Sequence, residues 1–150
     1  MLSPADAETS IAQQLRSSPS EAQPLSQCAG AVLREDVFAE RDQPPFDRVT
    51  MDGIAVDSAS VGTGTRRLAL QAVQAAGDPV LSLQRKDACI EVMTGAVLPV
   101  GCDAVIPVEH IAVSEGMAAL AEHVVATPFL NVHRRGSDVR QGARLIAAGS

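Results

Sequence analysis

The chain has 150 residues, of which 46% are hydrophobic and only 2% aromatic, and its formal net charge is −6. This length allows one ordinary domain or two small ones, with a core built mainly from Ala, Val, Leu and Ile. The negative charge and the shortage of aromatic residues argue against a nucleic-acid-binding protein, because such binding depends on phosphate neutralisation and base stacking.

The chain also lacks the usual signals for membranes, secretion and structural metal. No run approaches the roughly 20 continuous apolar residues of a membrane span. Asp6 and Glu8 interrupt the N-terminal segment, so no secretory signal is visible. The three cysteines are widely spaced and form no CxxC pair, which is typical of reduced thiols in a cytoplasmic protein. The three histidines fall in different segments, which favours surface or core-edge positions over metal ligation.

The N-terminal segment predicts a helix over residues 4–17. Ser3 is a suitable N-cap, and Asp6 stands where a capping box places an acidic residue. Ile11 and Leu15 recur at a helical interval and form one narrow apolar stripe. This stripe needs a partner surface, which is either the chain's own core or another subunit.

The next segment is less regular. Pro24 is placed to open a second short helix, and Gly30 is placed to end it. Residues 31–38 are rich enough in apolar side chains to predict a strand, and residues 42–46 predict a stiff connector.

From residue 54 onward, short apolar runs alternate with turn residues, and helical periods are absent. The segment 117–126 is ambiguous, but Gly116 before it and the two valines within it favour a strand. The predicted fold class is therefore α+β and mainly β, with an N-terminal helix region and a compact β-rich domain. The predicted strands are 54–56, 68–76, 89–94, 103–109, 111–113, 124–126 and 143–147.

The run over residues 44–56 places two carboxylates, Asp47 and Asp52, on either side of a short apolar patch. Because Asp52 directly precedes Gly53, we expect it on a tight, exposed turn leading into the strand 54–56. A carboxylate held on a rigid loop is suited to bind a cation or to orient a reacting water. The alternative is that Asp-Gly is simply a turn.

A second candidate site lies at residues 133–142, where Arg134, Arg135 and Arg140 surround Asp138. Arginine forks suit phosphate or oxyanion geometry, and the glycines of this stretch let backbone N–H groups approach a ligand. The stretch therefore predicts an anion-binding loop that also offers one carboxylate. The alternative is that the arginines neutralise Asp138 in a solvated turn.

A third candidate is Thr94, which a predicted strand delivers beside Gly95. Its hydroxyl could bind a ligand oxygen, although the same pattern is typical of an ordinary strand-to-loop transition. The sequence shows no P-loop, no nucleophile elbow and no HExxH motif.

Taken together, these stretches resemble the molybdopterin molybdenumtransferase family, the MoeA type shared with the E domain of gephyrin. The family pattern P-x-F-D-x-S-A-M-D-G-Y-A is similar to residues 44–55, and the element M-T-G-A-x-x-P is similar to residues 93–99. Three further elements resemble residues 25–37, 101–109 and 134–142.

The resemblance implies an elongated dimerisation unit formed by residues 1–46 with 130–150, and an inserted β-rich domain over residues 47–129. It also implies a homodimer that inserts molybdate into adenylylated molybdopterin with Mg²⁺ and cleavage of the nucleotide. Family members continue into an α/β domain that binds the pterin. We therefore expect little or no turnover from these 150 residues alone.

The resemblance assigns roles to single residues. The essential aspartate of the family falls on Asp52 and its second loop aspartate on Asp138, so these two carboxylates are expected to hold Mg²⁺ or to orient the attacking oxygen. The residues expected to bind substrate are Thr94, Gly95, Arg134 and Arg135.

The chain departs from the family pattern at several positions. Arg48-Val49-Thr50 stands where the family has Asn-Ser-Ala, Ile54 replaces a Tyr, and Ser137 replaces a Glu. A bulky cation in place of a small polar residue favours a second reading, a non-catalytic binding or dimerisation module. A third reading is an oxyanion-binding protein that uses Arg134, Arg135 and Arg140.

Overall fold

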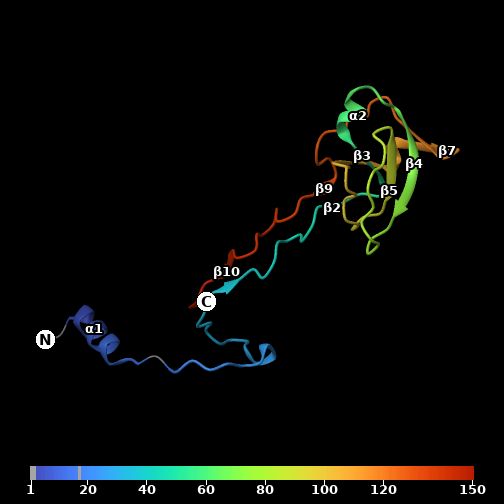
Figure 1. The fold of residues 1–150 in the computed structure, drawn as a ribbon. Coiled ribbons are helices and arrows are strands. Elements are labelled where there is room, and N and C mark those ends of the chain that lie inside the picture. Colours follow the sequence, from blue (N-terminus) through green and yellow to red (C-terminus); the bar gives the residue numbers. More distant parts are fainter. Residues whose placement is uncertain (1–2, 17) are drawn as a thin grey trace. The chain divides into compact units, whose positions relative to one another are not determined.

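A computed structural model describes residues 3–16 and 18–150 and divides the chain into two compact units. Unit 1 comprises Met1–Val37 with Ile146–Ser150, and unit 2 comprises Phe38–Leu145 (Figure 1). Along the described residues, no helix is long and apolar enough to cross a membrane.

Unit 1 begins with α1 (Pro4–Gln14), and its capping box forms as predicted. The Ser3 hydroxyl accepts a hydrogen bond from the backbone N–H of Asp6, and the Asp6 carboxylate accepts one from the Ser3 N–H. The Ser3 hydroxyl also donates to the Asp6 carboxylate at 2.6 Å, and this bond, followed by the bond from the Ser3 N–H, lowers the pKa of Asp6. The helix ends at Gln14 because Leu15 is extended; the predicted end, residue 17, lies outside the described residues.

The rest of unit 1 contains little regular structure. The predicted second helix is a single 3₁₀ turn, η1 (Leu25–Gln27), and Gly30 follows it with φ +81°. The predicted strand 31–38 is wrong except at β1 (Val37–Phe38), which pairs with β10 (Arg144–Ile146). Before β1, Leu33 instead exchanges single backbone hydrogen bonds with Gly149 and Ser150, and isolated bonds of this kind do not make a ladder.

Unit 2 contains a mixed six-stranded sheet with the order β6-β3-β5-β4-β8-β7. Its β4–β5 pair is parallel, and the other pairs are antiparallel. The mainly β fold class predicted from the sequence is therefore confirmed. The strands are β3 (Gly53–Val56), β4 (Arg67–Gln74), β5 (Ala88–Val92), β6 (Ala104–Pro107), β7 (Ile111–Ser114) and β8 (Met117–Leu120).

The centre of this sheet is buried on both faces. In β3, Ile54 and Val56 join one apolar cluster, whereas Ala55 between them joins a second cluster. Successive side chains of a strand point to opposite faces, so a strand covered on both sides is apolar throughout. This explains why the predicted strands are short continuous apolar runs rather than alternating patterns.

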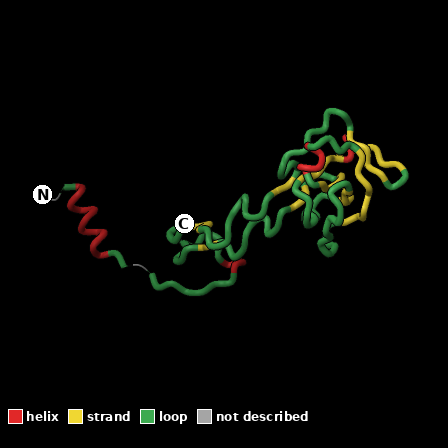
Figure 2. Tube along the Cα trace, turned by 45° about the horizontal axis from the view of Figure 1, so that its top comes forward, coloured by secondary structure: helices red, strands yellow, loops and turns green. Residues whose placement is uncertain are grey.

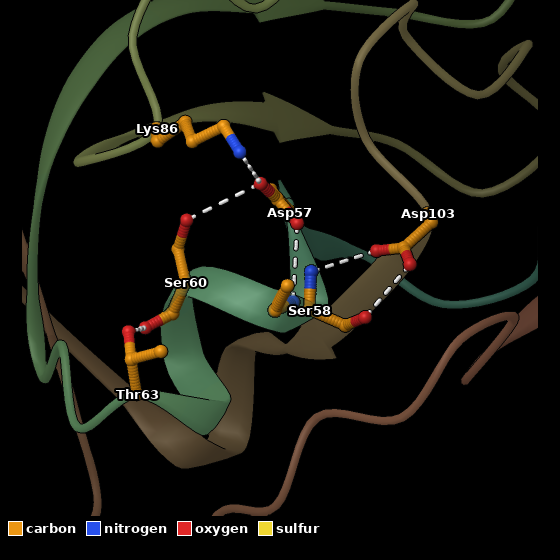
Figure 3. A network of polar contacts seen from close by, with 7 residues as sticks. Asp57, Ser58, Ser60, Thr63, Lys86 and Asp103 are labelled. Carbon is orange, nitrogen blue, oxygen red and sulfur yellow. Dashed lines mark hydrogen bonds and ion pairs between the residues drawn. The ribbon is translucent and has the colours of Figure 1, made fainter.

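The helix α2 (Ser58–Gly62) follows β3, and the sequence analysis missed it. Five residues are too few for a visible helical period, and capping holds the helix instead. Asp57 accepts from the Ala59 N–H, and Asp103 accepts from both the N–H and the hydroxyl of Ser58, each at 2.7 Å (Figure 3). Val61 then packs into the same cluster as Ile54.

Two further short strands lead from the sheet toward a pair of adjacent segments. The strands β2 (Arg48–Val49) and β9 (Val132–His133) are antiparallel. Beyond them, residues 38–47 and 134–145 run side by side, joined at Ala39 to Ala143 and at Gln43 to Val139 (Figure 2). The predicted strand 124–126 is wrong, because the chain turns after β8, with Val124 N–H bonded to Ala121 O.

Candidate active site around strand β2

Asp52 occupies an exposed bend directly before β3, as the sequence predicted. Its Oδ1 accepts two hydrogen bonds from Thr94, one from the backbone N–H and one from the hydroxyl, each at 2.7 Å. The Asp52 carbonyl accepts the Val108 N–H at 3.0 Å, which fixes the backbone of the bend. Asp52 and Thr94, two of the candidate residues predicted from the sequence, are therefore in direct contact.

The Thr94 hydrogen bonds hold the Asp52 carboxylate in its ionised form. They lower its pKa below the ordinary value of 3.8, the bond from the hydroxyl contributing most and the bond from the backbone N–H next. Among the residues that the structure describes, none donates a hydrogen bond to Asp52 Oδ2. The carboxylate is thus anchored at one oxygen and open at the other.

The loop after β5 is tied directly to β2. Gly95 has φ +91°, a conformation that favours glycine, and its N–H donates to the Val49 carbonyl at 2.9 Å. The Val49 N–H in turn donates to the Ala96 carbonyl at 2.9 Å. This pair of bonds determines where Thr94 lies relative to Asp52. An added Cβ on Gly95 would contact only Ala76, at 3.6 Å, so conformation rather than space requires this glycine.

Asp138 is held by a histidine, not by the neighbouring arginines. His133 Nε2 lies 2.7 Å from Asp138 Oδ1, and His133 Nδ1 lies 3.0 Å from an Arg48 guanidinium nitrogen. Because a guanidinium can only donate, Nδ1 must accept, and the network assigns the ring proton to Nε2. His133 is therefore a neutral imidazole that donates to Asp138 while Arg48 binds its other side.

The sequence analysis did not assign a role to Arg48 or His133. Arg48 was noted only as a departure from the family pattern, and His133 only as one member of a basic stretch. They meet because β2 and β9 are antiparallel with Arg48 opposite His133. A two-residue strand gives too little periodicity to predict this register, so the sequence carried no signal for the contact.

The predicted arginines have different surroundings. Arg134 lies over the Phe129 ring, 4.3 Å from its centroid, in a cation–π contact that leaves the guanidinium exposed. Arg135 donates through Nε to Asp42 at 2.7 Å and through its backbone N–H to Asp47 at 2.8 Å. The pKa of Asp42 is lowered, mainly by the Gln141 N–H and then by Arg135. Arg135 therefore uses its Nε and its backbone N–H to join residues 134–145 to residues 38–47.

The two candidate carboxylates are anchored to the same short strand. Val49 fixes the loop that carries Thr94, which binds Asp52, and Arg48 binds the histidine that holds Asp138. Over residues 3–16 and 18–150, no direct hydrogen bond joins Asp52 to Asp138, and no three His, Cys, Asp or Glu side chains gather as a metal site. Chemically, the arrangement offers two exposed carboxylates and a set of arginine donors.

The chain belongs to the family described as the MoeA N-terminal region (domain I and II), whose model matches residues 2–150. It is 40% identical over 121 residues to a molybdopterin molybdenumtransferase of Synechocystis, covering 81% of this chain and 31% of the relative. It is 33% identical over 144 residues to molybdopterin molybdenumtransferase 2 of Mycobacterium tuberculosis, covering 93% of this chain and 35% of the relative.

Solved structures agree with this assignment. The molybdopterin biosynthesis MoeA protein from Pyrococcus horikosii superposes with a TM-score of 0.82 and 29% identity, covering 98% of this chain and 38% of that one. A second structure of a MoeA protein, from Pyrococcus horikoshii OT3, gives a TM-score of 0.76 at 30% identity, over 86% of this chain and 35% of that one. The family resemblance stated from the motifs is confirmed, and the chain spans about a third of the length of these relatives.

Proposed function

We propose that this chain contributes one part of the active site of a molybdopterin molybdenumtransferase, which inserts molybdate into adenylylated molybdopterin in the cytoplasm. The observation that carries the proposal is the pair of hydrogen bonds that Thr94 donates to Asp52 Oδ1. It orients a carboxylate, keeps it ionised and leaves one oxygen open, on the motif that resembles the family's essential aspartate.

Within this proposal, Asp52 and Asp138 hold Mg²⁺. The donor chemistry fits, because Mg²⁺ prefers carboxylate oxygens and usually binds through one or two carboxylates plus substrate phosphates. Each carboxylate uses Oδ1 for its protein contacts, and no described residue donates to either Oδ2. When bound, Mg²⁺ would neutralise negative charge on phosphate oxygens.

The remaining residues bind and orient the substrate. The exposed Arg134 guanidinium offers a fork to a phosphate or to molybdate, and the aromatic face of Phe129 restricts its position. The guanidinium of Arg135 supplies further donors, and Gly95 lets a ligand approach closely because it has no side chain, while His133 and Arg48 hold the Asp138 carboxylate in place. The proposed assembly is a homodimer formed through residues 1–46 and 130–150.

The test is an Asp52→Asn exchange in the protein that carries this chain, with Glu122→Gln as the matched control. Glu122 is exposed in unit 2, and its exchange removes the same charge. We expect Asp52→Asn to abolish molybdenum insertion, measured as activation of a molybdenum-dependent reporter enzyme, while the oligomeric state stays unchanged. Undiminished insertion in Asp52→Asn would contradict the proposal.

A second candidate function is a non-catalytic binding or dimerisation module. It is favoured by Arg48, whose guanidinium engages His133 at the position where the family pattern has a small polar residue. Unchanged cofactor insertion in Asp52→Asn would support this second function. Mg²⁺-dependent release of AMP by residues 1–150 alone would contradict both readings, since each holds that these residues do not complete the site.

A further inference from the structure

Two exposed histidines meet in unit 2, and neither is among the residues of the proposed active site. His110 ends the 3₁₀ turn η2 (Val108–His110), and His123 lies in the turn after β8. His123 Nε2 is 3.3 Å from His110 Nδ1, and the ring planes are at 88° with centroids 4.9 Å apart. Sequence patterns do not pair these two histidines, because they belong to different elements.

The fold holds both backbones in place. The hairpin of β7 and β8 pairs Ile111 with Leu120, so the residues flanking it on either side come together. The Ala121 N–H donates to the His110 carbonyl at 2.9 Å, which extends the ladder by one bond. Leu120 and Val124, on either side of His123, are both buried in the core. The distance between the two rings can therefore change only by rotation of the imidazole side chains.

The separation of the two nitrogens matches the spacing of ligands on one metal ion. Two imidazole nitrogens bound to tetrahedral zinc at about 2.0–2.1 Å are about 3.3–3.4 Å apart. We propose that His110 Nδ1 and His123 Nε2 form a two-histidine site for a divalent transition-metal ion such as Zn²⁺. Each ring then carries its proton on the opposite nitrogen, Nε2 of His110 and Nδ1 of His123.

The chemistry distinguishes this site from the proposed magnesium site. Imidazole suits Zn²⁺, Cu²⁺ and Ni²⁺, whereas Mg²⁺ prefers oxygen ligands. No third His, Cys, Asp or Glu joins the pair within the part of the chain that the structure describes, so water would complete the coordination. A bound ion would link the start of β7 to the turn after β8 and stabilise unit 2 by mass action.

The cysteines are the main competing ligands, and among the described residues none of them groups with the two histidines. Burial raises the pKa of Cys89 to about 11 and that of Cys102 to about 12, so both remain protonated thiols at neutral pH. Cys28 is only partly buried and is therefore the thiol to remove. In a Cys28→Ser background, that partly buried thiol no longer competes with the histidines for the metal ion.

The experiment is calorimetric titration of the Cys28→Ser chain with Zn²⁺, and separately with Mg²⁺. We expect one Zn²⁺ per chain, at least tenfold weaker binding in both His110→Ala and His123→Ala, and unchanged binding in His133→Ala. Zn²⁺ should also raise the thermal midpoint of the parent but not of the first two variants. Absence of zinc binding, or binding that persists in both His110→Ala and His123→Ala, would overturn the proposal.

Discussion

The two units of this chain differ in how far they bury their own apolar surface. In unit 2, the buried residues form two clusters on opposite faces of one sheet. In unit 1, no described residue is buried, and Ile11 and Leu15 are 61% and 73% exposed. Unit 2 therefore has the burial needed for independent stability, whereas α1 depends on its cap and on whatever surface covers its apolar stripe.

The difference in burial between the two units also bears on how the carboxylates of the proposed site are held. The carboxylates of the proposed site lie on bends and loops, but each is attached through β2 to the packed sheet of unit 2. A rigid sheet can hold a loop carboxylate in one orientation, which an element without a core cannot do. The following changes are ordered from the largest expected effect to the smallest.

Gly53→Ala should be the most damaging change in unit 2. A Cβ at this position would lie 2.0 Å from the Ile106 carbonyl oxygen, which is backbone within the paired strand β6. We expect a loss on the order of 4 kcal/mol or complete failure to fold, because neither strand can move away without breaking the ladder. Urea unfolding measures it, with Gly62→Ala as the control, since nothing lies within 4 Å there. A normal unfolding midpoint in Gly53→Ala would show that β3 and β6 are not packed so closely.

Ile90→Ala should cost nearly as much, whereas the same kind of truncation in unit 1 should cost little. Ile90 is fully buried in the second apolar cluster, so its truncation leaves a cavity and removes about 3 kcal/mol from the free energy of unfolding. Ile11→Ala removes a side chain that is already exposed and should change it by less than about 0.5 kcal/mol. Equal effects of the two changes would break the comparison between the units.

Gln74→Leu should have an intermediate effect on unit 2. The buried Gln74 donates to the Val97 carbonyl at 2.6 Å and accepts from the Leu81 N–H at 2.7 Å. Leucine satisfies neither group, so we expect a loss of about 2 kcal/mol in urea unfolding. Gln71→Leu is the matched control, because Gln71 makes similar bonds to Ser82 and Gln84 at an exposed position.

Thr94→Val should affect stability in a pH-dependent way. Because Thr94 lowers the pKa of folded Asp52 below its ordinary value of 3.8, its contribution is present above that pH and is lost as the pH falls through the folded-state value. Thr94→Val should therefore be less stable than the parent at neutral pH, and the difference should shrink as the pH falls below 3.8. Thr94→Ser keeps the hydroxyl and should follow the parent. A stability difference that does not change with pH would indicate a packing effect instead.

Ser3→Ala should have the smallest effect, confined to unit 1. It removes the hydroxyl that accepts from the Asp6 N–H and should lower the helical circular-dichroism signal of α1. The unfolding midpoint of unit 2 should not change, and Ser10→Ala within the same helix is the control. A shift in that midpoint would show that the helix stabilises unit 2.

Local structural features could be predicted from the sequence where neighbouring residues determine them. The cap at Ser3, the exposed bend at Asp52 and most strands of unit 2 were predicted, because capping, turn formation and strand burial depend on short spans of residues. The reason for Gly53 is not local, however, because it does not take a positive φ. The close approach of the Ile106 carbonyl, which lies on another strand, requires a glycine there.

By itself, the sequence determined the family, the mainly β fold class and the candidate residues, since motif spacing and apolar runs can be recognised without knowledge of the fold. Only the tertiary structure decided which of these residues meet. Thr94 binds Asp52 across 42 positions, and Arg48 binds His133 across 85. These contacts follow from strand register, and register depends on the packing of the whole sheet rather than on any segment within it.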